Sequence, residues 1–395
     1  MDKTYMTADQ RSLPNVSTQK LEDTALNLST SNRKPTDNDS LGFVVLGSVL
    51  SIYTIIIIVG VLGNVTLIKV FVTVKSMQTV PNIFIASLAI GDLLLILTCV
   101  PVDASRYLAE AWLFGRAGCK IISFIQLTTV GVSVFTLTVL SADRYRAIAR
   151  PMDRQGADAV LKTCCKGGLV WVVSMLLAIP EAVFSDLYSF SVPGSNTTFE
   201  TCAPYPVTDK VLVEVHSMSC FLIFYLLPLS ISSVFYALIA RKLIQSACDM
   251  PGEEHDNLCK QVEARKRLAK MVLVLVFLFA ICWLPNHILY LYRSFTYHSL
   301  VDSSLGHLLA TFVSRALAFS SSVVNPFALY CLSKSFRQHF NHHLCWMCLQ
   351  QKTIHRNTFV TSNTGITMAT RCLSEGKGDG SPKTEIADRN HFKLY

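Results

Sequence analysis

Four polar side chains interrupt the most apolar stretches of this chain, and they are the first candidates for chemistry. Asn64, Asp92, Ser133 and Asn325 each lie among runs of aliphatic and aromatic residues. A carboxylate in apolar surroundings is costly, so such positions are functional candidates by default. Together with the other three polar residues, Asp92 suggests a small-cation site or a protonation switch. A purely structural network of hydrogen bonds explains the same residues.

A second set of reactive side chains lies near the carboxyl terminus. Cys345 and Cys348 have a Cys-x-x-Cys spacing, and His342 and His343 lie just before them. This pattern permits a metal site or a redox pair. We favour S-acylation of both cysteines and predict no metal, because they adjoin an amphipathic helix suited to the membrane surface. The apolar stripe of that helix is formed by Phe336, Phe340 and Leu344.

Long apolar runs must position these side chains. The chain has 395 residues, of which 51% are hydrophobic and 16% are charged, and this composition excludes an ordinary water-soluble protein. Apolar runs of roughly 20 residues or more, long enough to cross hydrocarbon, recur along the chain. They lie at about 42–70, 80–104, 116–149, 164–186, 212–242, 266–293 and 304–331. We therefore predict an all-α membrane protein, a bundle of seven transmembrane helices followed by a short amphipathic helix.

The basic residues predict the orientation of this bundle. They are dense between the third and fourth spans and between the fifth and sixth, and sparse in the opposite loops. Because positive charge stays cytoplasmic, the amino terminus is expected outside and the carboxyl tail inside. The net charge of +8 is therefore a topology signal rather than evidence for nucleic-acid binding. Residues 1–40 have no apolar core, so we expect an uncleaved first span as the anchor.

Modification sites follow from this orientation. Residues 1–41 are polar, and we predict a disordered, glycosylated extracellular tail. The Asn-x-Ser/Thr sequons on the predicted outer side are Asn15, Asn27, Asn38 and Asn196. Cys119 and Cys202 are the only cysteines predicted on the oxidising outer side, so we expect a disulfide between them. The seven-span receptor domain is predicted at 42–331, the amphipathic helix with its acylation site at 332–348, and a disordered cytoplasmic tail at 349–395.

Short motifs on the predicted spans resemble the rhodopsin-like G-protein-coupled receptors. These motifs are Gly63-Asn64, Leu88-Ala89-x-x-Asp92, Asp143-Arg144-Tyr145, Trp171, Pro228 with Tyr236, Phe279-x-x-x-Trp283-x-Pro285 and Asn325-Pro326-x-x-Tyr330. Each motif is weak alone, but all occur in order and on the expected span. Longer strings at 77–85, 99–107, 131–138 and 282–287 are similar to the bombesin receptors.

The resemblance implies a signalling switch. Asp143 is implied to hold Arg144 at rest, and outward movement of the sixth span would open a cleft for a G-protein α subunit. Pro285 interrupts the backbone hydrogen bonds of its helix and permits a kink beside Trp283. Val134, Pro228 and Phe279 resemble the packing triad that transmits the movement. The full set of implied switch residues is Asp143, Arg144, Tyr145, Tyr236, Asn325, Pro326 and Tyr330.

Two positions depart from the family pattern. Many members have an acid at the inner end of span six that pairs with the switch arginine, but Arg265 occupies that position here. The arginine is therefore expected to be restrained by its neighbouring aspartate alone. Ser321 stands where many related receptors have Asn, which weakens the sodium site expected at Asp92 and Ser133. We expect no other cofactor.

The outer half of the bundle indicates the ligand class. Gln126 stands where amine receptors have an Asp, so an amine ligand is disfavoured. Arg293 and Arg315 favour a peptide, since a guanidinium seeks carbonyl, carboxylate or aromatic partners. Arg293 could equally be a solvated loop charge. The full predicted ligand-binding set is Gln126, Pro204, Trp283, Asn286, His287, Arg293 and Arg315.

Different segments of the chain resemble different subtypes of the bombesin receptors. The run 75–79 is most like subtype three, whereas Gln126 and Arg293 are as in the gastrin-releasing-peptide and neuromedin B receptors. The mammalian subtype-three receptor has Arg and His at these two positions. The resemblance implies a subtype-three-like or related fourth-subtype receptor of the plasma membrane for amidated bombesin-like peptides. It implies signalling mainly through Gq, phospholipase C and calcium, with arrestin and receptor kinases acting on the Ser/Thr-bearing tail.

Other functional classes fit this sequence less well. A seven-span transporter or channel would show internal repeats and helices broken in corresponding halves. No internal repeat is visible, and Asp92 is the only acid deep in a predicted span. An enzyme needs a base, a nucleophile and oxyanion donors that converge, and no such set is apparent. A receptor is the function that the sequence favours.

Overall fold

Long helices dominate the computed structural model, which describes residues 37–109, 112–149, 158–191, 198–203, 209–248, 255–296 and 305–342. The chain divides into two units, Met1–Cys345 and Trp346–Tyr395, and all described residues lie in the first unit. The long helices are α2 (Asp37–Thr73), α3 (Val80–Ser105), α4 (Gly115–Ala149), α5 (Asp158–Phe184), α6 (Lys210–Phe221), α7 (Leu227–Cys248), α8 (His255–Thr296) and α9 (Leu305–Leu332). A further short helix occupies residues 334–342.

Seven helical segments of the described chain are long and apolar enough to cross a membrane. They are Leu46–Thr73, Val80–Ser105, Gly115–Ala149, Ala159–Phe184, Lys210–Gln245, Glu263–Thr296 and Gly306–Leu332. This confirms the predicted seven-helix bundle with a short helix after the last span. The fourth span begins at Ala159 rather than at 164, because Lys162 and Lys166 are accommodated at its polar end, where long basic side chains reach water.

Two helices depart in detail from the predicted boundaries. α2 begins at Asp37, so residues 37–41, predicted as part of the disordered tail, are helical. Helix formation is cooperative, and a long apolar helix extends at little cost into its polar flank. The fifth span is not one regular helix, because a π-helical turn at Leu222–Leu226 joins α6 to α7. Such π turns are rare and often mark functional positions.

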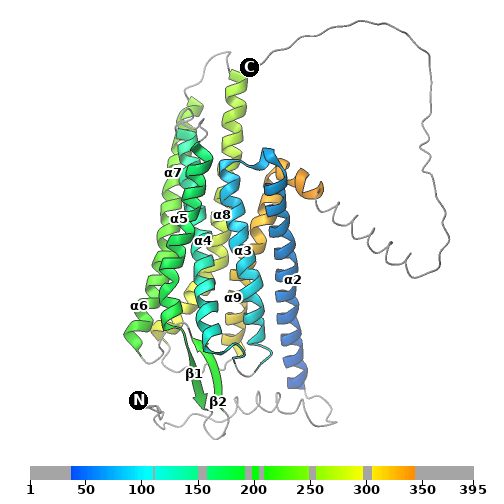
Figure 1. Cartoon of the computed structure of the whole chain (residues 1–395), viewed down its shortest axis with the longest axis vertical. Helices are drawn as coiled ribbons and strands as arrows, with labels where there is room; N and C mark the ends of the chain where they lie inside the picture. Colours follow the sequence, from blue (N-terminus) through cyan, green and yellow to red (C-terminus); the bar gives the residue numbers. More distant parts are fainter. Residues whose placement is uncertain are drawn as a thin grey trace, which may run out of the picture. The chain divides into compact units, whose positions relative to one another are not determined.

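The helices run alternately up and down, so that each end of the bundle collects alternate loops (Figure 1). Interhelical contacts bury large side chains such as Tyr53, Phe84, Phe224 and Phe319. Large apolar side chains also cover the outside of the bundle, including Ile55, Leu97, Leu176, Phe277 and Phe327. An apolar surface of this kind suits a bundle surrounded by lipid, where polar backbone is satisfied within each helix.

A β-hairpin lies at one end of the bundle, called the hairpin end below (Figure 1). Its strands β1 (Asp186–Ser191) and β2 (Thr198–Ala203) pair antiparallel, with Leu187 opposite Cys202. Cys202 forms a disulfide with Cys119 in the first turns of α4, and the two Cα atoms are 5.6 Å apart. The predicted disulfide is therefore confirmed, and it ties the hairpin to the bundle.

Several predicted sites lie outside the described residues. These are the sequons at Asn15, Asn27 and Asn196, the candidate ligand-binding residue Pro204, and the candidate acylation sites Cys345 and Cys348. Asn38 lies in the first turn of α2. Glycosylation and acylation accordingly stay predictions.

Candidate functional site

A buried carboxylate joins α3 to α9 in the middle of the bundle, and a nearby amide of α2 extends the network. The Asp92 side chain accepts hydrogen bonds from Ser322 Oγ and from Asn325 Nδ2, each at 2.8 Å. Asn64 Nδ2 donates to the carbonyl oxygens of Gly60 at 2.9 Å and Ser322 at 3.0 Å. Three of the four polar residues singled out from the sequence thus form one network across α2, α3 and α9. Ser133, the fourth, is half-buried on α4.

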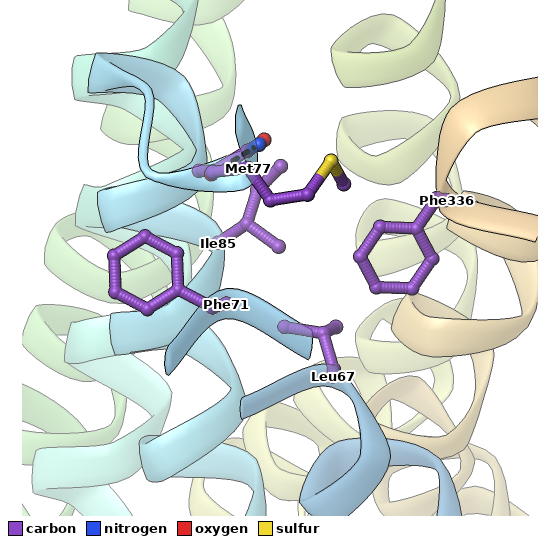
Figure 2. A pocket seen from close by; sticks show the side chains of 6 residues that line it. Leu67, Phe71, Met77, Ile85 and Phe336 are labelled. Atoms are coloured by element: carbon purple, nitrogen blue, oxygen red, sulfur yellow. Dashed lines mark hydrogen bonds between the residues drawn. The ribbon is translucent and has the colours of Figure 1, made fainter. Parts of the chain in front are cut away.

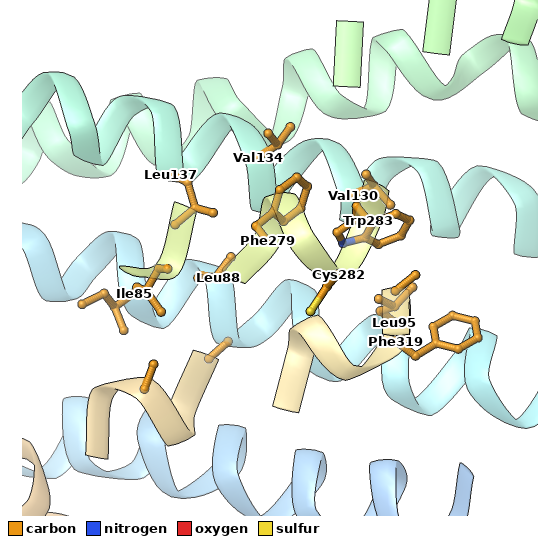
Figure 3. Close-up of a cluster of buried hydrophobic side chains, with 14 of the residues drawn as sticks. Ile85, Leu88, Leu95, Val130, Val134, Leu137, Phe279, Cys282, Trp283 and Phe319 are labelled. Atoms are coloured by element: carbon orange, nitrogen blue, oxygen red, sulfur yellow. The ribbon is translucent and has the colours of Figure 1, made fainter. Parts of the chain in front are cut away.

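The indole of Trp283 connects α8 to α9 above this network. Its Nε1 donates to Ser321 Oγ at 3.1 Å, and the Ser321 hydroxyl donates to the Ala318 carbonyl at 2.6 Å. Ser321, the residue at which the sequence departs from the expected family pattern, is therefore the hydrogen-bond partner of Trp283. The Trp283 ring also stacks on Phe279, with ring centroids 5.9 Å apart, and Figure 3 shows Phe279 beside Val134 of α4.

The candidate switch lies toward the opposite end of the bundle from the hairpin. Arg144 Nη2 is 2.5 Å from Asp143 Oδ2, and both side chains are buried, each only 5% exposed. The local pairing predicted from the sequence is thus present. The buried Arg144 Nε and the Tyr236 hydroxyl each lack a hydrogen-bond partner within the described part of the chain. Buried donors of this kind favour a rearrangement that satisfies them.

An acid that sequence reasoning overlooked binds Arg315. The guanidinium of Arg315, on α9, pairs with Asp103 Oδ1 near the end of α3, while Tyr53 donates to Asp103 Oδ2 at 2.6 Å. Arg106 Nε lies 3.7 Å from the same carboxylate. Phe312 packs edge-on against the Tyr53 ring at 5.6 Å. Asp103 could have been suspected, since it lies inside the predicted second span, where a charged side chain is costly.

Arg293 also spans two helices at the hairpin end. Its Nη2 lies 2.8 Å from His307 Nε2 and donates to Thr311 Oγ1 at 2.5 Å, and its Nε lies 3.1 Å from the same histidine nitrogen. These contacts tie the last turn of α8 to the first turns of α9. Arg293 is therefore a positioned helix residue in this structure rather than a solvated loop charge.

The other described candidates for ligand binding come from α4 and α8. Gln126 and Asn286 are half-buried, and His287 is buried. The His287 ring contacts aromatic rings of two helices, with centroids 4.9 Å from Tyr225 and 6.2 Å from Trp283. Its buried Nε2 has no hydrogen-bond partner among the described residues. The described candidates thus approach the bundle interior from the hairpin side of Trp283.

Comparison with known proteins places this arrangement in a family. Residues 63–330 match the model of the 7 transmembrane receptor (rhodopsin family). The [Phe13]-bombesin receptor of Bombina orientalis is 67% identical over 307 residues, covering 78% of each chain. Bombesin receptor subtype-3 of Ovis aries is 60% identical over 311 residues, covering 79% of this chain and 78% of the relative.

The family match and both relatives agree with the seven-helix fold described above. The chain belongs to the rhodopsin family of seven-transmembrane receptors and, within that family, to the bombesin receptors. This is a class of membrane receptors that couple to G proteins, and it is not a class of enzymes.

Proposed function

We propose that this chain is a cell-surface receptor for amidated bombesin-like peptides and that it signals through Gq, phospholipase C and calcium. The observation that carries the proposal is the position of Arg293, which His307 and Thr311 hold between α8 and α9. A guanidinium presented in this way suits a ligand rich in carbonyl oxygens and aromatic rings, as a peptide is. The similarity to two bombesin receptors supports the same ligand class.

The hairpin end is the proposed extracellular face. The Cys119–Cys202 disulfide supports this orientation, because disulfides persist in oxidising compartments. The basic residues between the third and fourth spans and between the fifth and sixth support the same orientation. The peptide would therefore enter beside the hairpin, and the G protein would bind the end that carries Arg144.

A chain of contacts connects these two ends. The Trp283 indole donates a hydrogen bond to Ser321. A peptide that reaches Trp283 would compete with Ser321 for this hydrogen bond or reorient the indole. Phe279 stacks on the same indole and lies beside Val134 of α4. A movement of Trp283 would therefore shift α8 relative to α4 at this contact. The π-helical turn and Pro285 leave backbone groups free to adjust in α6–α7 and α8. Outward movement of α8 would then expose Arg144, with Tyr236 as its new partner.

A calcium assay tests this function. Cells that display the receptor should respond to bombesin, gastrin-releasing peptide and neuromedin B, with bombesin among the potent ligands. Arg144→Ala should abolish the calcium signal while surface density and peptide binding are retained, because it removes the G-protein switch alone. Absence of saturable bombesin binding to displayed receptor would refute the proposed ligand. A peptide-driven current that needs no G protein would instead favour a channel.

Sodium at Asp92 is a proposal of its own. We propose that Na⁺ binds at Asp92 and Ser133 only weakly, since Ser322 and Asn325 already donate to the Asp92 carboxylate. Sodium ions should therefore change agonist affinity about twofold or less, a free-energy difference of about 0.4 kcal/mol. Titration of agonist binding with NaCl against equal choline chloride measures the effect, and Asp92→Asn should remove it. A tenfold sodium effect would contradict a weak site.

The predicted modifications and tail partners complete the proposal. We propose N-glycosylation at Asn15, Asn27, Asn38 and Asn196, and S-palmitoylation at Cys345 and Cys348. Receptor kinases and arrestin are proposed to act on the Ser/Thr-bearing tail at 349–395. A glycosidase should increase the electrophoretic mobility of the mature receptor. Replacement of both cysteines by Ser should abolish labelling by a palmitate analogue.

A further inference from the structure

Three side chains with metal-binding atoms meet at the hairpin side of α5 and α6. Glu181 Oε1 lies 3.2 Å from His216 Nε2, and Cys220 Sγ lies 3.8 Å from the same nitrogen. All three candidate ligand atoms are within 4.8 Å of one another. Glu181 comes from the last turn of α5, and the other two residues come from α6. These residues belong neither to the predicted peptide pocket nor to the Arg144 switch.

The local sequence explains how α6 contributes two ligands. His216 and Cys220 are four residues apart in a helix, and residues at this spacing present their side chains on one face. Glu181 then reaches this face from α5. An ion pair between Glu181 and His216 alone would account for the burial of the acid, but not for the thiol directed at the same imidazole nitrogen.

The distances fit a tetrahedral zinc ion. Zinc bonds of about 2.0–2.1 Å to nitrogen and oxygen and about 2.3 Å to sulfur place tetrahedral ligands about 3.3–3.6 Å apart. The observed separations of 3.2 Å and 3.8 Å from His216 Nε2 lie close to this range. A thiolate, an imidazole and a carboxylate together suit Zn²⁺ better than Mg²⁺ or Ca²⁺, which prefer oxygen.

Neighbouring groups support the ligands. The Tyr290 hydroxyl of α8 lies 3.2 Å from His216 Nδ1, and Ser185 Oγ donates to Glu181 Oε2 at 3.5 Å. A hydrogen-bond partner at one imidazole nitrogen fixes the ring and leaves the other nitrogen for the metal, as is usual for metal-binding histidines. The contact with Tyr290 also connects the cluster to α8, the helix that moves in the proposed signalling mechanism.

We propose that Glu181, His216 and Cys220 bind a Zn²⁺ ion, with a fourth position occupied by water. On binding, the Cys220 thiol loses its proton to solvent and its sulfur donates an electron pair to the metal. The ion would clamp α5 to α6 at the hairpin end. Access is from that end, because Glu181 lies within one turn of the α5 terminus at Phe184.

The first experiment measures thermal unfolding of the full-length receptor, purified in detergent and freed of metal with a chelator. ZnCl₂ should raise the midpoint of unfolding by a few degrees, and further as its concentration exceeds the dissociation constant, because a ligand that binds only the folded state stabilises it. MgCl₂ should not. Cys220→Ser and Glu181→Gln should each lose most of this shift, whereas Cys331→Ser, a control at an exposed thiol of α9, should retain it.

The second experiment needs no variant that might alter folding. Zn²⁺ should slow alkylation of Cys220 in the native receptor at least tenfold, as quantified by peptide mass spectrometry. The exposed Cys164 and Cys165 should react at the same rate with and without the metal. Co²⁺ in place of Zn²⁺ should give the charge-transfer absorption of a thiolate ligand. Unchanged Cys220 alkylation would overturn the proposal and leave a structural Glu181–His216 pair. None of these measurements uses a peptide, so the result is independent of the ligand proposed above.

Discussion

Asp103 is the residue on which the charges at the hairpin end converge. Its carboxylate is 4% exposed and meets Arg315, Tyr53 and Arg106. A buried carboxylate is tolerated because its partners compensate for lost hydration. Arg315 therefore has a partner in its own chain, and a peptide that engages this guanidinium must share it with Asp103.

Loss of Arg315 alone should lower the stability of the receptor more than loss of both charges of the Asp103–Arg315 pair. Arg315→Gln leaves the buried Asp103 charge with the Tyr53 hydrogen bond and the more distant Arg106, and we expect a loss of about 2–3 kcal/mol in stability. Asp103→Asn in the same chain should recover part of that loss, since the unpaired charge disappears. Thermal unfolding of the two single variants and the double variant forms a mutant cycle. Strictly additive effects would show that the ion pair does not couple these residues.

The Gln126/Arg293 pair is the residue-scale determinant of peptide affinity. Gln126→Arg with Arg293→His should weaken bombesin binding at least tenfold, or about 1.4 kcal/mol. The shorter imidazole cannot span from α8 to His307 and Thr311 as the guanidinium does. Saturation binding measures the effect, and Arg241→His, on an exposed position of α7, is the matched control. Normal bombesin affinity with normal surface density would show that the pocket assignment is wrong.

At the scale of elements, the apolar runs predicted the seven spans, but single-residue details escaped them. Hydropathy averages over a window, so the π-helical turn at Leu222–Leu226 leaves no trace in it. Spacing also says little about which faces of distant helices meet. Asp103 and Arg315 are 212 residues apart, and the cluster of Glu181 with His216 depends on how a side chain at the end of α5 reaches α6. The family motifs, by contrast, contain Asn64, Asp92 and Asn325 of the buried network and both members of the Asp143–Arg144 pair, but not Ser322.

The helix at 334–342 is attached to the bundle by Phe336. The sequence predicted an apolar stripe suited to the membrane surface. In the structure, Phe336 is buried and lines a small cavity with Leu67, Met77 and Ile85 (Figure 2). The Phe340 ring lies 5.6 Å from Tyr330, so the same stripe also contacts the last span.

Truncation of that anchor should destabilise the receptor. Phe336→Ala should cost about 3 kcal/mol, since a buried aromatic side chain leaves a cavity when it is removed. Phe327→Ala removes the same atoms from a side chain that is 65% exposed on the outside of α9, and it should cost much less. Thermal unfolding in one detergent compares the two. If the two variants lose the same stability, burial of Phe336 does not anchor the helix at 334–342.

Gly63 sets the approach of α2 to α9. A Cβ atom added there would lie 2.8 Å from Cγ of Pro326, and a proline ring cannot rotate away. Gly63→Ala should therefore lower stability by about 1–3 kcal/mol, the usual cost of overpacking. Gly47→Ala on the same helix meets nothing within 4 Å and should be neutral or slightly stabilising. A matched loss of stability at Gly47, where helix propensity favours Ala over Gly, would mean that close packing against Pro326 does not decide the outcome.

At the scale of the whole molecule, the receptor is an equilibrium between closed and open arrangements of α8, and the balance depends on few restraints. Within the described structure, Arg144 is paired with its neighbour Asp143, and Arg265 in the first half of α8 is a base that cannot form a salt bridge with it. Restraint by a neighbour on the same helix does not oppose movement of α8 directly. We therefore expect measurable signalling without peptide.

Two substitutions should move this equilibrium in opposite directions. Asp143→Asn removes the charge that holds Arg144 and should raise peptide-independent inositol phosphate accumulation several-fold. Arg265→Glu provides an acid on α8 that can pair with Arg144 across the bundle, and it should lower that basal signal. Both values are normalised to surface receptor density, and Arg267→Glu, at an exposed position two residues further along α8, controls for the change in charge. If Arg265→Glu and Arg267→Glu lower basal signalling equally, general electrostatics rather than an interhelical restraint on Arg144 governs the closed state.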